Sequence, residues 1–356
     1  MQPVVHFKNV TKLYGTQPAV QDLDLSITPG QFVTLLGPSG CGKSTTLRML
    51  GGFEDPTSGE IYLDGKPISH LPPNKRNVNI VFQDYALFPH LTVGRNVAFG
   101  LELKGMENAA IHKRVMELLS LVSLEDFAER MPGQLSGGQR QRVALMRALA
   151  PDPNVLLLDE PLSALDAKLR QQMQIELKSI QKTTGKTFIF VTHDQEEALT
   201  MSDVVVVMNK GRIEQMGDPN ALYSRPVSRF VADFIGQSNF LEARVLSVDG
   251  DVATLDWKGA TIHAHVNGAA RAPGSTATVA LRPEALYCLD AKPEGRLALK
   301  GRIASRVFKG AHTSLTVALD NGETLLVQLD PVALSHIPGD DVWVGWRERD
   351  AVLLAD

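Results

Sequence analysis

The chain opens with short apolar runs that are separated by turn residues. Each run is continuous enough to be a buried strand, and Pro29-Gly30 marks a turn before the last of them. The runs are Val4–Phe7, Leu23–Ile27 and Phe32–Leu36. The glycine-rich stretch Gly37–Ser44 comes next, and we predict that Thr45–Leu50 continues as a helix. Strand, glycine-rich loop and helix in this order form the setting in which backbone N–H groups surround a phosphate.

Around residues 107–130 the pattern becomes helical, because apolar side chains recur at i, i+3, i+4 and i+7. These side chains are Val115, Leu118, Leu119 and Val122. Further along, Ser136 and Gln139 have the spacing of a capping box. We predict that a helix begins there and runs to about Ala150, where Pro151 stops it.

Strands and helices alternate in the segment that follows. Val155–Leu158 is a continuous apolar run of the kind found in buried parallel strands. A helix is predicted over about residues 166–182, and Thr187–Val191 is predicted to be the next strand. This alternation indicates a mostly parallel α/β sheet in the first part of the chain.

After about residue 240 the runs become short and alternating, and turn dipeptides such as Asp249-Gly250 and Pro273-Gly274 separate them. The triplet Asp320-Asn321-Gly322 between two alternating runs predicts a hairpin. The predicted strands are Arg244–Val248, Thr254–Trp257, Thr261–Val266, Thr276–Leu281, Leu315–Leu319, Thr324–Leu329 and Val342–Trp346. This part is predicted to be a small all-β barrel or sandwich.

The length of 356 residues favours two or three domains. Because 44% of the residues are hydrophobic, the chain can bury a sizeable core. Acidic residues outnumber basic ones by 40 to 36, and by 25 to 24 in residues 1–239 and 15 to 12 in residues 240–356. Neither part is basic, which argues against electrostatic binding of nucleic acid. All three tryptophans lie in the second part.

The cysteines and the apolar runs bear on where the chain acts. Cys41 and Cys288 cannot build a disulfide framework, which favours a reducing cytoplasm. The first residues lack the apolar segment of a signal peptide. The longest apolar runs, such as Val204–Met208, are far shorter than the roughly 20 residues that cross a bilayer. Any membrane role is therefore expected to come through a partner.

The glycine-rich loop matches G-x-x-x-x-G-K-[ST] in full. Its residues are Gly37, Pro38, Ser39, Gly40, Cys41, Gly42, Lys43 and Ser44, and Thr45 follows in the predicted helix. Glycines let successive N–H groups point at phosphate oxygens, Lys43 would bridge the β- and γ-phosphates, and Ser44 would bind Mg²⁺. The alternative, a chance glycine turn, does not explain the flanking strand and helix. Cys41 is interpreted as a small residue that fits, in preference to a reactive thiol.

Two acidic residues follow the buried run that ends at Leu158. Asp159 is placed to make an outer-shell contact with Mg²⁺ beside the phosphate loop, and Glu160 to polarise the attacking water. A single acid at a strand end is often only a helix cap. Two adjacent acids after four apolar residues favour the catalytic interpretation.

A second set of motifs resembles the ABC-type ATPases over residues 4–235. Leu135-Ser136-Gly137-Gly138-Gln139 resembles their signature motif, Gln83 their Q-loop, and Ser163-Ala164-Leu165-Asp166 their D-loop. His193 matches the switch histidine, and Tyr14 the aromatic that stacks on adenine. An isolated tyrosine near a strand often only packs, and Gln83 would be a surface residue by default, but the surrounding motifs favour the functional interpretation of both. Asp166 can cap the following helix and also contact the partner copy.

The resemblance implies a mechanism. Two copies would form a head-to-tail homodimer, with ATP held between the phosphate loop of one copy and Ser136, Gly137, Gly138 and Gln139 of the other. Glu160 and His193 would be catalytic, Asp166 would contact the partner copy, and Ser44, Gln83 and Asp159 would hold Mg²⁺. The glycine-rich helix N-terminus at Ser136 suits contact with a γ-phosphate.

Within this family the chain is similar to bacterial importer subunits, especially the spermidine/putrescine import ATPases. Shared stretches include Phe188–Met201 and Phe230–Phe240, and Leu281-Arg282-Pro283-Glu284 resembles a recurring stretch of their accessory oligonucleotide-fold-like module. Ferric-iron, sulfate, sugar and phosphonate importers share nearly all the motifs and stay open as alternatives. A soluble ABC ATPase that acts on nucleic acid or ribosomes is the alternative from another class.

The expected fold is an α/β P-loop NTPase domain over residues 1–239, an ABC ATPase core with a helical subdomain at about residues 90–150. A small all-β, OB-like domain over residues 240–356 follows it. The resemblance implies two membrane permease subunits, an extracytoplasmic solute-binding protein, no nucleic acid, and a peripheral place on the cytoplasmic face of the bacterial inner membrane. Residues 240–356 are also candidates to sense a ligand or a regulatory protein.

Overall fold

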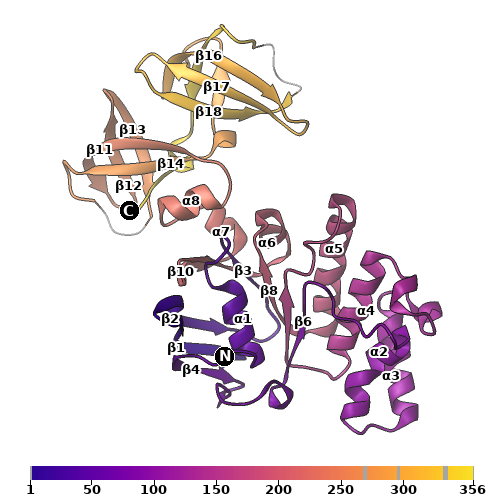
Figure 1. Ribbon diagram of the computed structural model, residues 1–356. Helices are drawn as coiled ribbons and strands as arrows, with labels where there is room; N and C mark the ends of the chain where they lie inside the picture. Colours follow the sequence, from indigo (N-terminus) through magenta and orange to yellow (C-terminus); the bar gives the residue numbers. More distant parts are fainter. Residues whose placement is uncertain (1, 268–270, 295–296, 332–335, 356) are drawn as a thin grey trace. The chain divides into compact units, whose positions relative to one another are not determined.

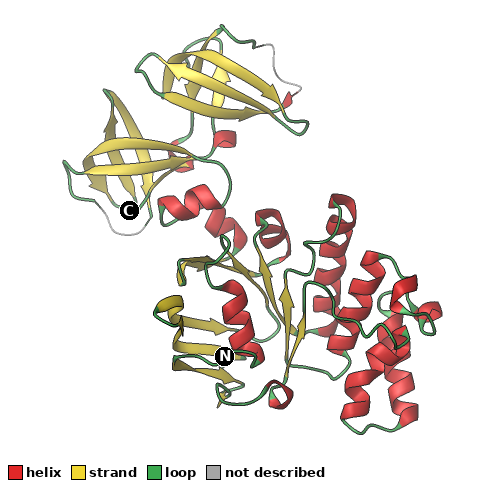
Figure 2. Ribbon diagram, viewed as in Figure 1, coloured by secondary structure: helices red, strands yellow, loops and turns green. Residues whose placement is uncertain are grey.

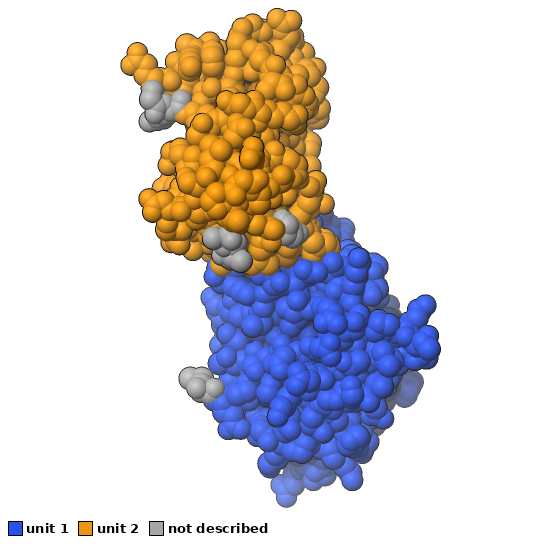
Figure 3. Space-filling model, turned by 90° about the vertical axis from the view of Figure 1, so that its left-hand side faces the viewer, with its two compact units in different colours: residues 1–219 blue, residues 220–356 orange. Residues whose placement is uncertain are grey.

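A computed structural model describes residues 2–267, 271–294, 297–331 and 336–355. The chain divides into two compact units, residues 1–219 and 220–356, which Figure 3 draws in blue and orange. The predicted boundary at 239/240 therefore lies inside unit 2. The reason is that two short helices, α7 (Pro219–Ser224) and α8 (Arg229–Phe234), are part of the second unit, where Ala232 of α8 packs with Ala280.

The centre of unit 1 is a six-stranded sheet with the order β10-β9-β3-β8-β7-β6 (Figure 1). Its strands are β3 (Phe32–Leu36), β6 (Val78–Val81), β7 (Val155–Asp159), β8 (Thr187–Thr192), β9 (Val204–Asn209) and β10 (Arg212–Gly217). All pairs are parallel except β9 with β10. Every residue of β3 and β8 is buried, which explains why these strands are continuous apolar runs in the sequence.

A second, antiparallel sheet with the order β2-β1-β4-β5 completes the strands of unit 1. Its members are β1 (Val5–Tyr14), β2 (Gln17–Ile27), β4 (Ser58–Leu63) and β5 (Lys66–Pro67). Buried residues alternate with exposed ones along the second half of β2, as expected of a sheet with one buried face.

The helices of unit 1 fall into two groups. Those that accompany the parallel sheet are α1 (Lys43–Gly51), α5 (Ala167–Thr184) and α6 (Gln195–Met201). Those that gather at one side of the unit in Figure 1 are α2 (Val93–Leu103), α3 (Asn108–Ser120) and α4 (Gly137–Leu149). The helical pattern predicted over 107–130 is wrong in its second half, because Ser123 takes a left-handed φ of 55° and the chain turns after Ser120.

Unit 2 consists mainly of strands (Figure 2). One group closes a barrel in the order β11-β12-β13-β20-β14, and the other forms an open sheet in the order β15-β19-β16-β17-β18. The barrel strands are β11 (Asn239–Asp249), β12 (Val252–Trp257), β13 (Ala260–Val266), β14 (Thr276–Leu281) and β20 (Ala351–Leu353). The others are β15 (Tyr287–Leu289), β16 (Ala298–Phe308), β17 (Thr313–Leu319), β18 (Thr324–Leu329) and β19 (Asp341–Gly345).

The predicted hairpin at Asn321-Gly322 joins β17 and β18, where the Leu319 N–H donates to the carbonyl oxygen of Glu323 at 2.8 Å. The pattern did not predict β16, because its second half is exposed on both faces and a bulge at Ile303 interrupts its pairing. Short 3₁₀ helices lie at Pro73–Lys75, Glu125–Phe127, Pro132–Gln134, Pro283–Ala285 and Glu348–Asp350. Within the described ranges, no helix combines the length and apolar character that a membrane span needs.

Candidate functional site

The register of the parallel sheet brings four chain segments to one edge of unit 1. Leu36 at the end of β3 pairs with Thr192 at the end of β8, and Asp159 at the end of β7 pairs with Val191. Leu158 pairs in turn with Val81 at the end of β6. The carboxyl ends of these parallel strands therefore lie side by side at one edge of the sheet. They are followed by or carry the glycine-rich loop, Asp159 and Glu160, His193, and the loop that contains Gln83. This is the edge at which open α/β sheets bind ligands.

The glycines of the loop allow a backbone course that side chains would block. Gly40 has a φ of 78° and Gly42 a φ of 103°, both in the left-handed region. A Cβ on Gly42 would lie 2.5 Å from the carbonyl oxygen of Ala19, and one on Gly37 would lie 2.3 Å from that of Met208. The loop is thus tightly enclosed by β2 and β9, and it leads directly into the N-terminus of α1.

Lys43 lies inside the curl of this loop with only 5% of its surface exposed. Its Nζ donates hydrogen bonds to the carbonyl oxygens of Gly37 at 2.7 Å and Pro38 at 2.9 Å. The ammonium is therefore held at the helix N-terminus, where phosphate oxygens can take over these contacts. Burial raises the pKa of the neighbouring Cys41 thiol despite the charge of Lys43, which agrees with the interpretation of Cys41 as a small residue that fits.

Ser44 and Asp159 meet across 115 positions of sequence, because the Ser44 hydroxyl donates to Asp159 Oδ1 at 3.0 Å. Burial raises the pKa of Asp159, although the Ser44 hydrogen bond works in the opposite direction. A half-buried carboxylate whose ionised form is disfavoured, beside a hydroxyl oxygen, is a donor set that fits Mg²⁺, a hard cation that prefers oxygen ligands.

Glu160 and His193 form a second pair at the same edge. His193 Nδ1 lies 3.4 Å from Glu160 Oε2. Glu160 has a left-handed φ of 45°, and its backbone N–H donates to the carbonyl oxygen of Val191 at 3.1 Å. A non-glycine residue held in this region is strained, and such strain concentrates at functional sites. The pair borders a cavity of about 50 Å³ that Ser163 also lines.

The signature segment begins helix α4. Ser136 is the N-cap: its hydroxyl accepts from the Gln139 N–H at 3.3 Å, and Gln139 Oε1 accepts from the Ser136 N–H at 2.9 Å. The hydroxyl proton of Ser136 is not used in this capping box and can donate to a ligand. Among the described residues, no hydrogen bond or ion pair joins this segment to Gly37–Ser44 of the same chain.

The remaining predicted residues occupy turns and ends of elements. Tyr14 is 48% exposed at the turn between β1 and β2, with Lys12 Nζ 5.1 Å from its ring centroid. Gln83 is exposed in the loop after β6. Asp166 is the N-cap of α5 and accepts from the Leu169 N–H at 2.9 Å, as its alternative interpretation as a helix cap requires.

Sequence reasoning missed a set of polar residues behind His193: Arg170, Thr192, Asp194 and Glu197. Thr192 donates from Oγ1 to Glu197 Oε2 at 2.6 Å, and Asp194 is the N-cap of α6. Burial raises the pKa of Glu197. The sequence does show an acid, Glu197, three residues after the N-cap Asp194. This spacing does not reveal that both acids face Arg170 on α5.

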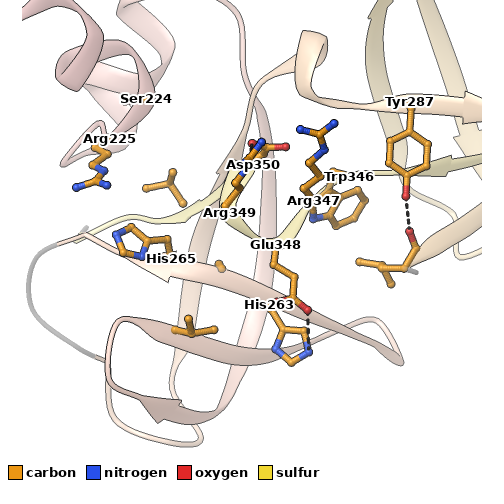
Figure 4. A pocket seen from close by; sticks show the side chains of 14 residues that line it. Ser224, Arg225, His263, His265, Tyr287, Trp346, Arg347, Glu348, Arg349 and Asp350 are labelled. Carbon is orange, nitrogen blue, oxygen red and sulfur yellow. Dashed lines mark hydrogen bonds and ion pairs between the residues drawn. The ribbon is translucent and has the colours of Figure 1, made fainter. Parts of the chain in front are cut away.

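Two larger hollows lie away from His193 and the polar residues around it. A groove of about 440 Å³ in unit 1 begins beside the Gln83 loop and is lined by apolar and aromatic side chains, including Phe53, Phe82, Phe88 and Phe99. In unit 2, a cavity of about 1050 Å³ is bordered by His263, Trp346 and the segment Arg347–Asp350 (Figure 4). Neither of these two hollows is lined by a residue of the phosphate loop.

A phosphate-binding loop at a helix N-terminus, with a half-buried carboxylate and a glutamate–histidine pair at neighbouring strand ends, defines a P-loop ATPase. Family models described as "ABC transporter" and "TOBE domain" match residues 20–163 and 279–354. The spermidine/putrescine import ATP-binding protein of Rubrobacter xylanophilus is 50% identical over 354 residues, which are 98% of this chain and 93% of that protein. A protein of the same name from Pseudomonas aeruginosa is 51% identical over 332 residues, which are 91% of this chain and 89% of that one.

Solved structures agree with these relatives. A dimeric ATP-binding cassette in a post-hydrolysis state, bound to ADP and phosphate, is 37% identical and has a TM-score of 0.54, with 60% of this chain and 98% of that chain covered. A component of an ABC transporter complex from Clostridium perfringens is 33% identical with a TM-score of 0.59, covering 62% and 91%. The chain belongs to the ABC transporter ATPases, within the family of spermidine/putrescine import ATP-binding proteins. The predicted fold class and the predicted resemblance are confirmed.

Proposed function

We propose that this chain is the ATP-hydrolysing subunit of a bacterial importer for polyamines such as spermidine and putrescine. The observation that carries the ATPase part is the meeting of Lys43, the Ser44–Asp159 pair and the Glu160–His193 pair at one edge of the parallel sheet. The polyamine part rests on relatives that are about half identical over nearly the whole chain.

Each residue of the site has a role that its position suits. Lys43 and the N–H groups of Gly37–Ser44 bind the β- and γ-phosphates of ATP. Ser44, Asp159 and Gln83 hold Mg²⁺, which neutralises phosphate charge. Glu160 orients the attacking water and accepts its proton, and His193 donates a hydrogen bond to the γ-phosphate. Tyr14, which is about half exposed at the turn between β1 and β2, stacks on the adenine.

The signature segment acts on the ATP of a second copy. Ser136, Gly137, Gly138 and Gln139 form the positive end of α4, and the free proton of Ser136 Oγ points to an acceptor outside the chain. A head-to-tail homodimer supplies that acceptor as the γ-phosphate bound by the partner. The dimeric relative with ADP and phosphate supports this arrangement.

Membrane partners complete the importer. The aromatic groove beside Gln83 suits a short apolar helix of a permease subunit, so closure of the dimer on ATP can move that helix. Two permease subunits and an extracytoplasmic solute-binding protein then place this chain peripherally on the cytoplasmic face of the inner membrane. Ferric-iron, sulfate, sugar and phosphonate import are the alternatives for the cargo.

The test is to purify the complex with its permease and binding protein and identify the retained solute by mass spectrometry. We expect spermidine or putrescine, and we expect the binding protein loaded with it to stimulate ATP hydrolysis. Retention of a sulfate, a sugar, iron or a phosphonate would overturn the polyamine assignment. Salt-dependent binding of nucleic acid by the chain alone would instead favour the other class of ABC ATPase.

Asp159→Asn tests the magnesium site. Because burial raises the pKa of Asp159 above 3.8, the folded state loses stability as pH rises from 3.8 through the raised pKa. Without nucleotide, we expect the variant to melt at a higher temperature than wild type at pH 7, and the difference to shrink toward pH 3. With ATP, its apparent affinity for Mg²⁺ should fall about 10- to 100-fold. Asp152→Asn, at a mostly exposed carboxylate, is the control.

The cavity in unit 2 favours a second role for residues 240–356, which is to sense a ligand. Arg225, Arg347 and Arg349 line it, and its two carboxylates have neighbours of their own, since Glu348 faces His263 and Asp350 faces Arg349 (Figure 4). This lining suits an anionic solute better than a polyamine. Buried Trp346 lies at the wall, with its ring centroid 6.4 Å from that of Trp257. Titration of the full chain with inorganic phosphate should change its tryptophan emission, and Trp346→Phe should remove most of the change. A flat titration would contradict an anion sensor.

A further inference from the structure

Arg170 occupies an unusual position between two catalytic segments. It lies in the first turn of α5, four residues after the N-cap Asp166, and its backbone N–H donates to the Asp166 carbonyl oxygen at 2.8 Å. Its side chain turns back, so that Nη2 donates to the carbonyl oxygen of Leu165 at 3.0 Å. One N–H group of the guanidinium is therefore hydrogen-bonded to the loop Ser163–Asp166, the segment that resembles the D-loop.

The guanidinium also meets the segment that carries His193. Nη1 lies 3.5 Å from Asp194 Oδ2, and Nε lies 3.8 Å from Glu197 Oε1. Both carboxylates are already engaged through their second oxygens. Asp194 Oδ1 accepts the N–H groups of Glu196 and Glu197 at the start of α6, and Glu197 Oε2 accepts from the Thr192 hydroxyl.

In the chain, His193 is thereby flanked by two residues that both belong to this network. Thr192 precedes it and bonds to Glu197, and Asp194 follows it and faces Arg170. The imidazole itself is 60% exposed, and in the described part of the chain its one ion-pair contact is with Glu160, 3.4 Å away. Its position relative to Glu160 is accordingly set by its flanking residues.

The turn of α5 that carries Arg170 is itself fixed. The preceding residue, Leu169, packs against the backbone of Gly138, where an added Cβ would come within 3.1 Å of Leu169 Cδ1. From such an anchor, a rigid guanidinium can donate a hydrogen bond to one carbonyl and still hold its charge beside two carboxylates, whereas an ammonium on a flexible stem cannot keep all three contacts.

We propose that Arg170 is a positioning residue that ties the segment Thr192–Glu197 to the loop Ser163–Asp166, and so fixes His193 against Glu160 during ATP hydrolysis. The proposal rests on the proposed ATPase function. It assigns Arg170 no contact with ATP, so its removal should affect turnover and leave nucleotide binding intact.

The experiment measures steady-state ATP hydrolysis by the full chain carrying Arg170→Gln. We expect kcat to fall about 10- to 100-fold with the KM for ATP within about 2-fold of wild type, the pattern of an interaction needed in the transition state. Arg170→Lys should recover part of the loss, because it keeps one charged donor. Lys168→Gln, exposed on the same helix, is the matched control and should hydrolyse ATP like wild type.

A double variant separates positioning from a general structural effect. If Arg170 acts through His193, then Arg170→Gln combined with His193→Ala should be no slower than His193→Ala alone. Multiplied effects, a raised KM, or a kcat of Arg170→Gln within 2-fold of wild type would each overturn the proposal. A wild-type chain without Mg²⁺-dependent ATP hydrolysis would instead contradict the proposed function, which keeps the two failures distinct.

Discussion

Glu160→Gln is expected to lower the rate of ATP hydrolysis by about 10²- to 10⁴-fold, the usual contribution of a positioned general base. The amide keeps the size of the side chain and its contact distance to His193, but it cannot accept a proton from water. ATP affinity should stay within a few-fold of wild type, because Lys43 and the loop N–H groups are unchanged. Steady-state turnover and a nucleotide-binding titration measure the two quantities.

The same variant should also accumulate a dimer. If ATP joins two copies and hydrolysis separates them, a chain that binds but does not hydrolyse ATP remains paired, which light scattering with Mg²⁺ and ATP will show. Glu196→Gln, at an exposed acid in the first turn of α6, is the matched control and should stay active. Near-normal turnover by Glu160→Gln would remove Glu160 from its assigned role.

Arg282→Met is expected to reduce the free energy of unfolding of unit 2 by about 3–5 kcal/mol, the cost of breaking a buried charged network. The Arg282 side chain is 9% exposed. Its guanidinium donates to the carbonyl oxygens of Tyr223, Ala232 and Gln237 and to the Ser238 hydroxyl. It also lies 4.2 Å from the Tyr223 ring centroid. Methionine fills similar space but leaves these acceptors unpaired.

Tryptophan fluorescence makes this measurement specific, because all three tryptophans belong to residues 240–356. Urea unfolding followed by their emission therefore reports on unit 2. Arg302→Met is the control, since Arg302 makes an exposed ion pair with Asp341 and its loss should leave the unfolding midpoint nearly unchanged. An unchanged unfolding midpoint for Arg282→Met would show that the network contributes nothing.

The resemblance of Leu281–Glu284 to a recurring stretch of the accessory module gains a physical reason from the structure. Arg282 follows the last residue of β14 and binds the backbone of α7 and α8. Glu284 accepts a hydrogen bond from the Tyr223 hydroxyl. Burial of Tyr223 and, in addition, the negative charge of Glu284 raise the pKa of Tyr223 to about 12. The segment joins the two short helices to the barrel, which is why the second unit begins near residue 220 and not at 240.

Fold prediction worked best where the sequence pattern is local. The continuous apolar runs of β3, β7 and β8 are strands because both faces are buried. The Ser136–Gln139 capping box begins α4 because both hydrogen bonds close within four residues. The pattern was misleading after Ser120. Val122 continues the apolar spacing of the helix and is buried, but it lies in a turn.

The sequence by itself determined which groups the predicted site contains: in the phosphate loop, the paired acids and the signature segment, the residues of each motif lie next to one another in the chain. Only the tertiary structure decided which side chains meet. Ser44 reaches Asp159, and Arg170 reaches Asp194 and Glu197, through the register of parallel strands and the placing of α5 and α6. Such contacts depend on how distant segments pack, because hydrogen bonds between parallel strands form between parts of the chain that no local pattern connects.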